Sequence, residues 1–598
     1  MAHWSEESRK LEVAPVKVNH LRQLEVSDET TPSVWLFWLP FPRTDADAAT
    51  SKESFAELAK FCSQLNESST VCFLTTPPDA ALLLPYLEKF LKFQLWIAVK
   101  TVSEVYPATA GTIPNRHAAL LVLTKYHDSL RHTKTRTQYS YCPACGKTTK
   151  DYGGKKHTYH EYGTLLSDVW RDIGCNPIEN IDTVIDRLSD LFGLEPYKHL
   201  RLVDMQACEE LLTVKPDKKA EVISRTATVQ QAAMLESQLI SGNSLELLLS
   251  LPNDSIDFCF ADPPYNLKKK YDKWDDALES VEYFAWCDKW LSELCRVLKP
   301  GRTLAVLNIP LWAVRHYQHL NSIMDFQAWI AWDGLSFPVR MIMPAHYAVI
   351  CFSKGKPRPL PGLSYENSNN LSEECYLKSL GENYCLRTTC ISKRHRLGET
   401  DRSNISDLWH DIHRLKHNSR RVDHPCQLPP ALMRRLYALF TKPGEMVLDC
   451  FNGAGTSTLV AQQMERKFIG IELSSHYHEL ALQRHEQIAR GTDPFGKEYS
   501  IPTAKNSPVQ RLPKQKYQVT KKTLQLDVKR IAHELGRLPT REEVQCLSKY
   551  PIEYFIKYFI SWGEVCAAAR TTGMSESPTK LVDEDSEKQL DLYMLQDV

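Results

Sequence analysis

The sequence contains 598 residues, of which 43% are hydrophobic and 24% charged, and its 73 Lys and Arg residues balance 73 Asp and Glu residues. This length exceeds that of one compact domain, so we expect two or three domains. No apolar run is long enough to cross a bilayer, and the N-terminus lacks a basic start followed by an apolar stretch. We therefore expect a cytoplasmic protein without a signal peptide. The zero net charge means that affinity for a polyanion must come from local basic segments.

A Cys-x-x-Cys motif followed by a His-x-x-His pair is the first distinctive feature in chain order. It supplies four candidate metal ligands, Cys142, Cys145, His157 and His160. Two thiolates and two imidazoles suit a tetrahedral zinc ion, and Gly146 suits the tight turn of a zinc knuckle. Four ligands leave no open position, so we predict one structural zinc in an insert at residues 142–160. Free thiols or a redox pair are the alternatives.

The stretch from about Gln238 to Arg490 alternates short buried strands with helices. We expect strands at residues 255–260, 303–307, 446–448 and 468–471, and helices at 284–298 and 458–464. This alternation predicts an α/β fold with a doubly wound, Rossmann-like sheet, whose ligand site lies at the carboxyl ends of the strands.

The chain beyond this sheet has a different composition. Residues 496–522 are rich in Lys, Pro, Gln and Ser, which is typical of a basic linker. Helical patterns follow at 524–535, 540–547 and 552–569, and the tail at 575–598 is acidic, with the composition of a disordered segment. We therefore expect a separate small helical module at residues 523–574.

An internal repeat relates the first part of the chain to the sheet region. The order of the matches, and the length of the Ser-Asp-x-Trp-x-Asp-Ile match, favour duplication over chance. We therefore expect residues 31–210 to be a second copy of the 235–495 domain, with a tail at 1–30 and a linker at 211–234. The matching pairs are His117–Val122 with His346–Cys351, Ser167–Ile173 with Ser406–Ile412, Ile185–Phe192 with Met433–Phe440, and Leu202–Asp204 with Val447–Asp449.

The motif Asp262-Pro263-Pro264-Tyr265 directly follows the strand that ends at Phe260. An exocyclic amine of adenine or cytosine is a poor nucleophile because the ring delocalises its lone pair. The Asp262 carboxylate and the Pro263 carbonyl can each accept one N–H and free that lone pair, and two prolines hold the loop rigid beforehand. Tyr265 offers a flat face on which a base swung out of a duplex can stack. The motif therefore predicts methylation of a nucleobase amine.

A glycine-rich turn lies between a predicted strand and a predicted helix. Its glycines let the backbone approach a ligand without a Cβ in the way. An acid ends the next strand, where it can accept hydrogen bonds from the two hydroxyls of a ribose. The turn and this acid predict a cofactor site made of Asp449, Phe451, Asn452, Gly453, Gly455, Thr456 and Glu472.

Together these segments resemble the β group of DNA amino-methyltransferases, in which the DPPY block precedes an FxGxG block. Residues 451–455 fit FxGxG, and residues 424–429 resemble the family's HPxQxP element. Residues 241–245 resemble a segment that usually reads Gly-Asp, with Asn243 in place of the Asp. The resemblance covers under half of the chain and implies S-adenosylmethionine as cofactor, with Asn243, Asp262 and Gln427 added to its site.

The resemblance also implies a target-recognition region at about residues 354–421, between the early strands and HPxQxP. Its basic side chains suit phosphate and guanine contacts, although a solvated surface loop has the same composition. They are Lys393, Arg394, Arg396, Arg414, Lys416, Arg420 and Arg421.

The N-terminal copy lacks the catalytic elements. Residues 39–42, 176–177 and 205–208 stand where DPPY, His-Pro and the glycine-rich turn would fall, so we expect this copy to bind no cofactor. Homologues of this class often pair as dimers. The resemblance therefore implies that residues 31–210 replace a second subunit, which makes the chain a monomer that acts as an internal pseudo-dimer.

The C-terminal residues 535–562 resemble the small helical repeat found with homing endonucleases, which implies a second DNA contact. A helix bundle with Trp562 in its core is the alternative.

We therefore expect a site-specific methyltransferase that moves a methyl group from S-adenosylmethionine to the exocyclic amine of a flipped base in double-stranded DNA. Adenine N6 is favoured over cytosine N4 because Asp262 rather than Ser opens the PPY motif. RNA methylation has the same chemistry, whereas a protein-glutamine target usually has Asn before PPY. A non-catalytic DNA-binding regulatory protein with a methyltransferase shell is the alternative of another class. A nucleoid-associated location is expected, and a cognate restriction endonuclease stays open as a partner.

Overall fold

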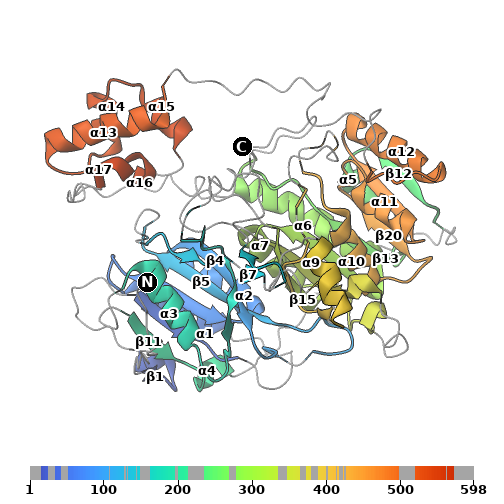
Figure 1. Ribbon diagram of the computed structural model, residues 1–598, viewed down its shortest axis with the longest axis horizontal. Coiled ribbons are helices and arrows are strands. Elements are labelled where there is room, and N and C mark those ends of the chain that lie inside the picture. Colours follow the sequence, from blue (N-terminus) through green and yellow to red (C-terminus); the bar gives the residue numbers. More distant parts are fainter. Residues whose placement is uncertain are drawn as a thin grey trace. The chain divides into compact units, whose positions relative to one another are not determined.

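The computed structural model describes residues 15–24, 34–41, 52–126, 130–148, 160–194, 200–212, 235–267, 278–334, 346–363, 372–378, 388–398, 402–415, 422–496 and 519–570, apart from residues 107, 131, 140, 143, 161, 413, 423, 425, 560 and 561. These residues divide into two compact units (Figure 1). The first holds two β-sheets, and the second holds the helices of residues 519–570. None of the described helices is both long and apolar enough to span a bilayer.

The N-terminal sheet has seven strands in the order β1-β11-β2-β3-β5-β4-β10, and only β5 runs antiparallel to its neighbours. Its strands are β1 (Val16–Lys17), β2 (Val34–Trp38), β3 (Thr70–Thr75), β4 (Lys92–Thr101), β5 (His117–Thr124), β10 (Val169–Cys175) and β11 (Leu200–Asp204). The helices of this half are η1 (Leu21–Gln23), α1 (Lys52–Ser63), α2 (Pro77–Leu87), α3 (Asp182–Phe192) and α4 (Glu209–Leu212). Two short ribbons pair β6 (Arg136–Thr137) with β9 (Thr164–Leu165) and β7 (Tyr141–Cys142) with β8 (Lys147–Thr148).

The second sheet has eight strands in the order β12-β21-β20-β13-β14-β16-β15-β19, and only β16 is antiparallel to its neighbours. Its strands are β12 (Gln238–Ser241), β13 (Ile256–Ala261), β14 (Leu298–Asn308), β15 (Asp325–Asp333), β16 (His346–Ser353), β19 (Leu408–Trp409), β20 (Met446–Asp449) and β21 (Lys467–Glu472). Its helices are α5 (Ser244–Ser250), α6 (Ser280–Val297), α7 (Pro310–Asn321), α9 (Thr388–Arg396), α10 (Pro430–Phe440), α11 (Thr456–Gln463) and α12 (Ser475–Ala489). Smaller elements are η5 (Pro361–Leu363), η7 (Glu373–Cys375) and the ribbon of β17 (Tyr376–Leu377) with β18 (Ser403–Asn404). The predicted α/β fold is confirmed.

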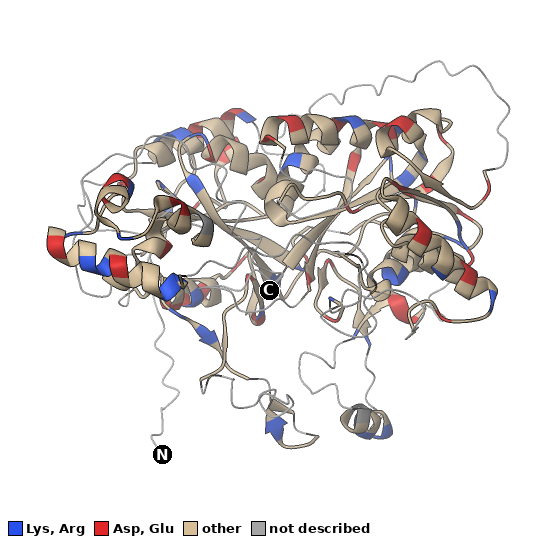
Figure 2. Ribbon diagram, turned by 90° about the horizontal axis from the view of Figure 1, so that it is seen from above, with Lys and Arg blue, Asp and Glu red and all other residues tan. Residues whose placement is uncertain are grey.

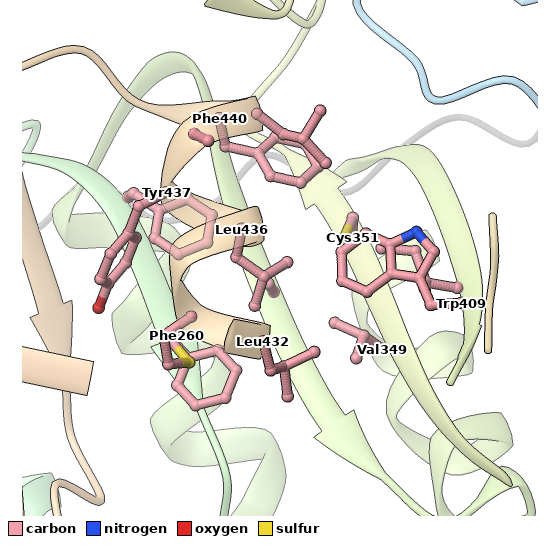
Figure 3. Packing of buried hydrophobic residues seen from close by; sticks show 14 of the residues in the cluster. Phe260, Val349, Cys351, Trp409, Leu432, Leu436, Tyr437 and Phe440 are labelled. Carbon is pink, nitrogen blue, oxygen red and sulfur yellow. The ribbon is translucent and has the colours of Figure 1, made fainter. Parts of the chain in front are cut away.

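Helix α10 is held on the second sheet by a large apolar cluster (Figure 3). Leu432, Leu436 and Phe440 lie in one buried cluster with Val349 and Cys351 of β16. The helix begins at a proline, whose missing N–H is not needed in the first turn. This packing fixes the start of α10 on the sheet.

Six strands repeat between the two sheets in the same order and directions. The series β11-β2-β3-β5-β4-β10 corresponds to β20-β13-β14-β16-β15-β19. A bulge also falls at the same place in both, between Phe93 and Leu95 of β4 and between Phe326 and Ala328 of β15. The repeated sequence segments thus occupy equivalent elements.

Equivalent residues of the two sheets meet each other. Trp96 of β4 stacks on Trp329 of β15, with ring centroids 4.8 Å apart and planes 4° from parallel. The buried His-Asp pairs are exchanged between the halves: they are His117 with Asp407 at 2.8 Å and His346 with Asp168 at 2.9 Å. Contacts in which residue i meets j and j meets i define an interface with local two-fold symmetry.

An Arg-Asp-Trp arrangement also occurs once in each half. In the second half, Arg435 of α10 donates to both carboxylate oxygens of Asp411, each at 2.7 Å, and lies over the ring of Trp409. In the first half, Arg187, Asp172 and Trp170 make the corresponding contacts. Burial by itself would raise the pKa of Asp411, but the hydrogen bonds and charge of Arg435 outweigh burial and lower it.

The second unit is a small helical bundle. Its helices are α13 (Lys521–Leu535), α14 (Arg541–Leu547), α15 (Ile552–Tyr558), α16 (Trp562–Val565) and α17 (Ala567–Arg570). Thr540 and Glu543 form a capping box at the start of α14. The prediction of one helix over 552–569 was wrong, because Phe559 adopts an extended conformation that ends α15. Figure 2 shows both basic and acidic residues on many of the helices.

The two Arg-Asp pairs give a matched test of burial. Asp411 is 3% exposed and Asp172 44% exposed. Arg435→Ala leaves a buried carboxylate without its cation and should cost about 3–5 kcal/mol. Arg187→Ala should cost at most about 1 kcal/mol, because water solvates Asp172. Urea unfolding followed by circular dichroism measures both variants, and equal losses of stability would contradict this explanation.

Candidate active site

Two loops leave the second sheet at one edge. β13 and β20 are parallel neighbours, and Phe260 lies opposite Asp449 in their register. The DPPY segment follows β13 and the glycine-rich turn follows β20, so both emerge at the carboxyl ends of adjacent strands. This is the edge at which open α/β sheets bind ligands.

A pocket opens between these loops. Its empty volume, including the part open to solvent, is about 1470 Å³. The predicted residues that line it are Asn243, Asp262, Pro263, Pro264, Tyr265, Gln427, Asp449, Phe451, Asn452, Gly453, Thr456 and Glu472. Gly455 was predicted with them, but it shapes the turn and does not line the pocket.

The DPPY loop is held at three points. The Tyr265 hydroxyl donates to Asp262 Oδ1 at 2.8 Å, which orients the carboxylate. The indole N–H of Trp312 donates to the Tyr265 carbonyl, and the Tyr283 hydroxyl donates to the Pro264 carbonyl, both at 2.7 Å. The Asp262 carboxylate and the carbonyls of Pro264 and Tyr265 are therefore held in place before any ligand binds.

The glycine-rich turn needs its glycines for space as well as for conformation. Gly453 has a φ of 49°, and a Cβ there would lie 2.8 Å from His424 Nε2. Gly455 has a φ of 83°, and a Cβ there would lie 2.9 Å from the Cβ of Ala481 on α12. The two glycines therefore let His424 and Ala481 pack directly against the turn.

Two acids, the buried Asp449 and the half-buried Glu472, stand beside this turn. Glu472 accepts hydrogen bonds from the backbone N–H groups of Gly453 and Ser474, each at 2.8 Å. Burial raises its pKa to about 7, despite the opposing hydrogen bonds. Burial also raises the pKa of Asp449 to about 6, although Ser457 and the N–H of Phe451 donate to it. A ligand whose hydroxyl groups donate hydrogen bonds to these carboxylates would stabilise their ionised form.

Two further predicted residues hold the pocket wall. The side-chain oxygen of Gln427 accepts a hydrogen bond from the backbone N–H of Val422 at 2.9 Å, which is a contact within the segment before α10. Asn243 caps α5 by accepting from the N–H of Leu245 at 2.9 Å, a role that Asn fills as well as Asp.

Aromatic residues that the sequence did not reveal complete the pocket. Trp332 and Tyr347 are directly paired across β15 and β16, with ring centroids 5.4 Å apart. Tyr347 lies 6.4 Å from the ring of Tyr265, and the guanidinium of Arg414 lies 5.3 Å from the Tyr347 centroid. These side chains offer flat faces next to the DPPY loop, which suits an unstacked base. Only the pairing of the two strands could have shown this grouping.

The other predicted residues are distributed as follows. Lys393, Arg394 and Arg396 lie on α9, while Lys416, Arg420 and Arg421 lie outside the described residues. Of the predicted zinc ligands, three lie among the described residues, and two of these three group together. Cys142 and Cys145 lie together with Cys390, His160 is not part of that group, and His157 lies outside the described residues.

Comparison with known families agrees with this geometry. Residues 256–483 match the family described as DNA methylase, of the N6/N4 type, and residues 519–569 match the homing endonuclease associated repeat. Most of the second sheet thus matches a DNA amino-methyltransferase domain, and the C-terminal module matches a repeat of the expected kind.

Individual relatives cover the same domain. The Type II methyltransferase M.BamHI of Bacillus amyloliquefaciens is 34% identical over 245 residues, which is 40% of this chain and 55% of that protein. M.HpaI of Haemophilus parainfluenzae is 28% identical over 276 residues, covering 43% of this chain and 77% of its own length. The chain therefore spans about half of M.BamHI. A Thermus thermophilus protein described as a DNA modification methylase, solved with S-adenosyl-L-methionine, is 23% identical, covers 42% of this chain and 96% of its own, and has a TM-score of 0.29.

Two glycines with positive φ, Gly444 before β20 and Gly453 after it, distinguish the effect of backbone conformation from the effect of limited space. Gly444 has a φ of 81° and nothing within 4 Å of an added Cβ, whereas Gly453 would meet His424. Both alanine variants carry backbone strain of about 1–2 kcal/mol. Only Gly453→Ala should also weaken S-adenosylmethionine binding, by about tenfold or more, in isothermal titration calorimetry. Equal affinity in the two variants would show that the close approach at Gly453 does not matter.

Proposed function

We propose that this protein transfers a methyl group from S-adenosylmethionine to the exocyclic amine of a flipped base in double-stranded DNA, with adenine N6 favoured. The observation that carries the proposal is the shared pocket of the Asp262 loop and the Gly453 turn. The match to the DNA methylase family supports the reaction class. The preference for adenine rests on Asp262 as the first residue of the motif.

The residues around the turn fit the proposed cofactor. Gly453 lies in the pocket lining, and Glu472 presents a half-buried carboxylate there that suits two ribose hydroxyls. Phe451 lies against Trp286, with ring centroids 5.7 Å apart, so this side of the pocket is apolar. When bound, the cofactor supplies an electrophilic sulfonium methyl.

The DPPY loop then prepares the amine. The Asp262 carboxylate, oriented by Tyr265, accepts one amine N–H, and the Pro263 carbonyl accepts the other. Both acceptors pull electron density towards the nitrogen and free its lone pair for attack in line with the methyl group. Because the loop is already fixed by Trp312 and Tyr283, this alignment needs little reorganisation during the reaction.

We further propose that residues 31–210 arose by duplication and act as a built-in partner subunit, so that the chain works as a monomer. The repeated strand order and the exchanged His-Asp pairs support this proposal. Segments 39–41 and 205–206, which replace the catalytic loops, contact each other, since the Gln206 side chain donates to the Leu39 carbonyl. The C-terminal repeat would add a second DNA contact, in a nucleoid-associated protein whose cognate endonuclease would cut the same site.

The reaction can be tested directly. The full chain, S-adenosylmethionine and unmethylated duplex DNA are incubated, and the digested nucleosides are identified by mass spectrometry. We expect N6-methyladenine, and N4-methylcytosine would instead identify the other base. Asp262→Ala should lower turnover at least about 100-fold while cofactor affinity stays near normal, because the carboxylate acts on the amine. Absence of any methylated base would support the non-catalytic, DNA-binding alternative.

Glu472 makes cofactor binding depend on pH. Its pKa in the empty protein is raised to about 7, so the carboxyl is mostly protonated at pH 6 and ionised at pH 8. Because burial disfavours the ionised carboxylate, deprotonation of Glu472 costs free energy in the empty protein. Hydrogen bonds donated by the ribose hydroxyls would offset this cost. Affinity should therefore rise about tenfold from pH 6 to pH 8. Glu472→Gln should flatten this profile in calorimetric titrations, and an unchanged slope would refute the assignment.

A further inference from the structure

Three cysteines from distant parts of the chain meet outside the catalytic pocket. Cys142 ends β7, Cys145 lies in the turn after it, and Cys390 lies on α9 of the other half. Their sulfur atoms all lie within 4.8 Å of one another. Cys142 is 1% exposed and Cys390 4% exposed, so the thiols face an enclosed space.

The first two cysteines are presented by a tight hairpin. β7 and β8 pair through only two residues each, and the Gly146 N–H donates to the Cys142 carbonyl at 2.8 Å. Gly146 has a φ of 66°, a conformation that glycine adopts most readily. The hairpin places the sulfurs of Cys142 and Cys145 on the same side of the turn.

Among the described residues, the apolar packing around this hairpin is small. The local cluster consists of Cys142 and Cys390, with Ala144 and Cys145 packed against it. An isolated two-stranded hairpin is at best marginally stable in water. A small element of this kind commonly depends on a metal ion for its stability.

We propose that Cys142, Cys145 and Cys390 bind one zinc ion as thiolates and that this ion joins the N-terminal insert to α9. Zinc–sulfur bonds of about 2.3 Å in tetrahedral geometry separate the sulfurs by about 3.8 Å, which lies within the observed limit. Each thiol loses its proton on binding. Three thiolates leave one net negative charge around the ion, and Lys393, whose ammonium lies 3.4 Å from the Ala144 carbonyl, partly offsets it.

This ligand set differs from the one that the sequence suggested. His160 is not in the group, and its Nδ1 accepts the backbone N–H of Tyr162 at 3.3 Å. The proposed ion links segments of both halves instead of closing a knuckle within one. Because α9 carries Lys393, Arg394 and Arg396, the ion would also fix a basic helix, whose contact with DNA rests on the proposed function.

Metal analysis of the purified full chain tests the site. We expect one zinc per chain by plasma mass spectrometry, with loss of that zinc in Cys390→Ser and Cys142→Ser. His160→Ala should keep the zinc, and so should Cys546→Ser, which removes an exposed cysteine of the second unit. Zinc lost from His160→Ala but kept in Cys390→Ser would overturn the proposal in favour of a knuckle closed within the N-terminal half.

A second measurement does not depend on folded variants. Titration of the parent protein with a mercurial thiol reagent should release the zinc, and cobalt in its place should show thiolate-to-metal charge-transfer absorption. No zinc in the parent after growth with added zinc, or a disulfide between two of these cysteines, would overturn the proposal. Metal content is independent of methyl transfer, so failure here and failure of the proposed function are distinguishable.

Discussion

The register between β13 and β20 determines where the chemistry can occur. Phe260 lies opposite Asp449, so the DPPY loop and the glycine-rich turn start at the same level of the sheet. A slip of one residue would turn the side chains of one strand to the other face of the sheet. Packing against α10 holds this register. The ring centroid of Phe258 on β13 lies 5.7 Å from that of Tyr437 and 5.8 Å from that of Phe440. Core packing and the catalytic pocket thus depend on one strand pair.

Sequence motifs predicted the parts of this pocket that are local. Asp262 directly follows β13, Glu472 ends β21, and Gly453 lies in the turn after β20. Parallel strands bring their ends together, so the convergence of these residues could be expected. Trp332 and Tyr347 could not be predicted, because they meet only through antiparallel pairing across residues without a motif. The grouping of Cys390 with Cys142 and Cys145 could not be predicted for a related reason. Sequence spacing identifies metal ligands within one segment, whereas Cys390 lies in the other half of the chain. The break at Phe559 depends on the bundle's packing, not on the helical pattern.

The two halves have equivalent residues at the interface between them, but they have different residues at the edge of the sheet where a ligand would bind. The stacked pair of Trp96 and Trp329 and the exchanged His-Asp pairs join equivalent positions. By contrast, Gly453, whose lack of a Cβ leaves room for the His424 side chain of the pocket lining, falls in a turn whose counterpart in the proposed N-terminal copy is residues 205–208. This pattern fits a half that works through its interface, as the proposed partner subunit would. It also explains why both sheets belong to one compact unit although the sequence suggested two domains.

The cysteine cluster is where this local symmetry ends. The hairpin of β7 and β8 belongs to the N-terminal half, and α9 belongs to the other half. In a dimer of identical subunits, a contact between two different segments must be made twice, once on each side of the axis. A chain that contains both halves can make it once and keep it on one side. A single ion between Cys142, Cys145 and Cys390 would therefore give the pair a fixed asymmetry, with the basic helix α9 held beside only one of the two sheets.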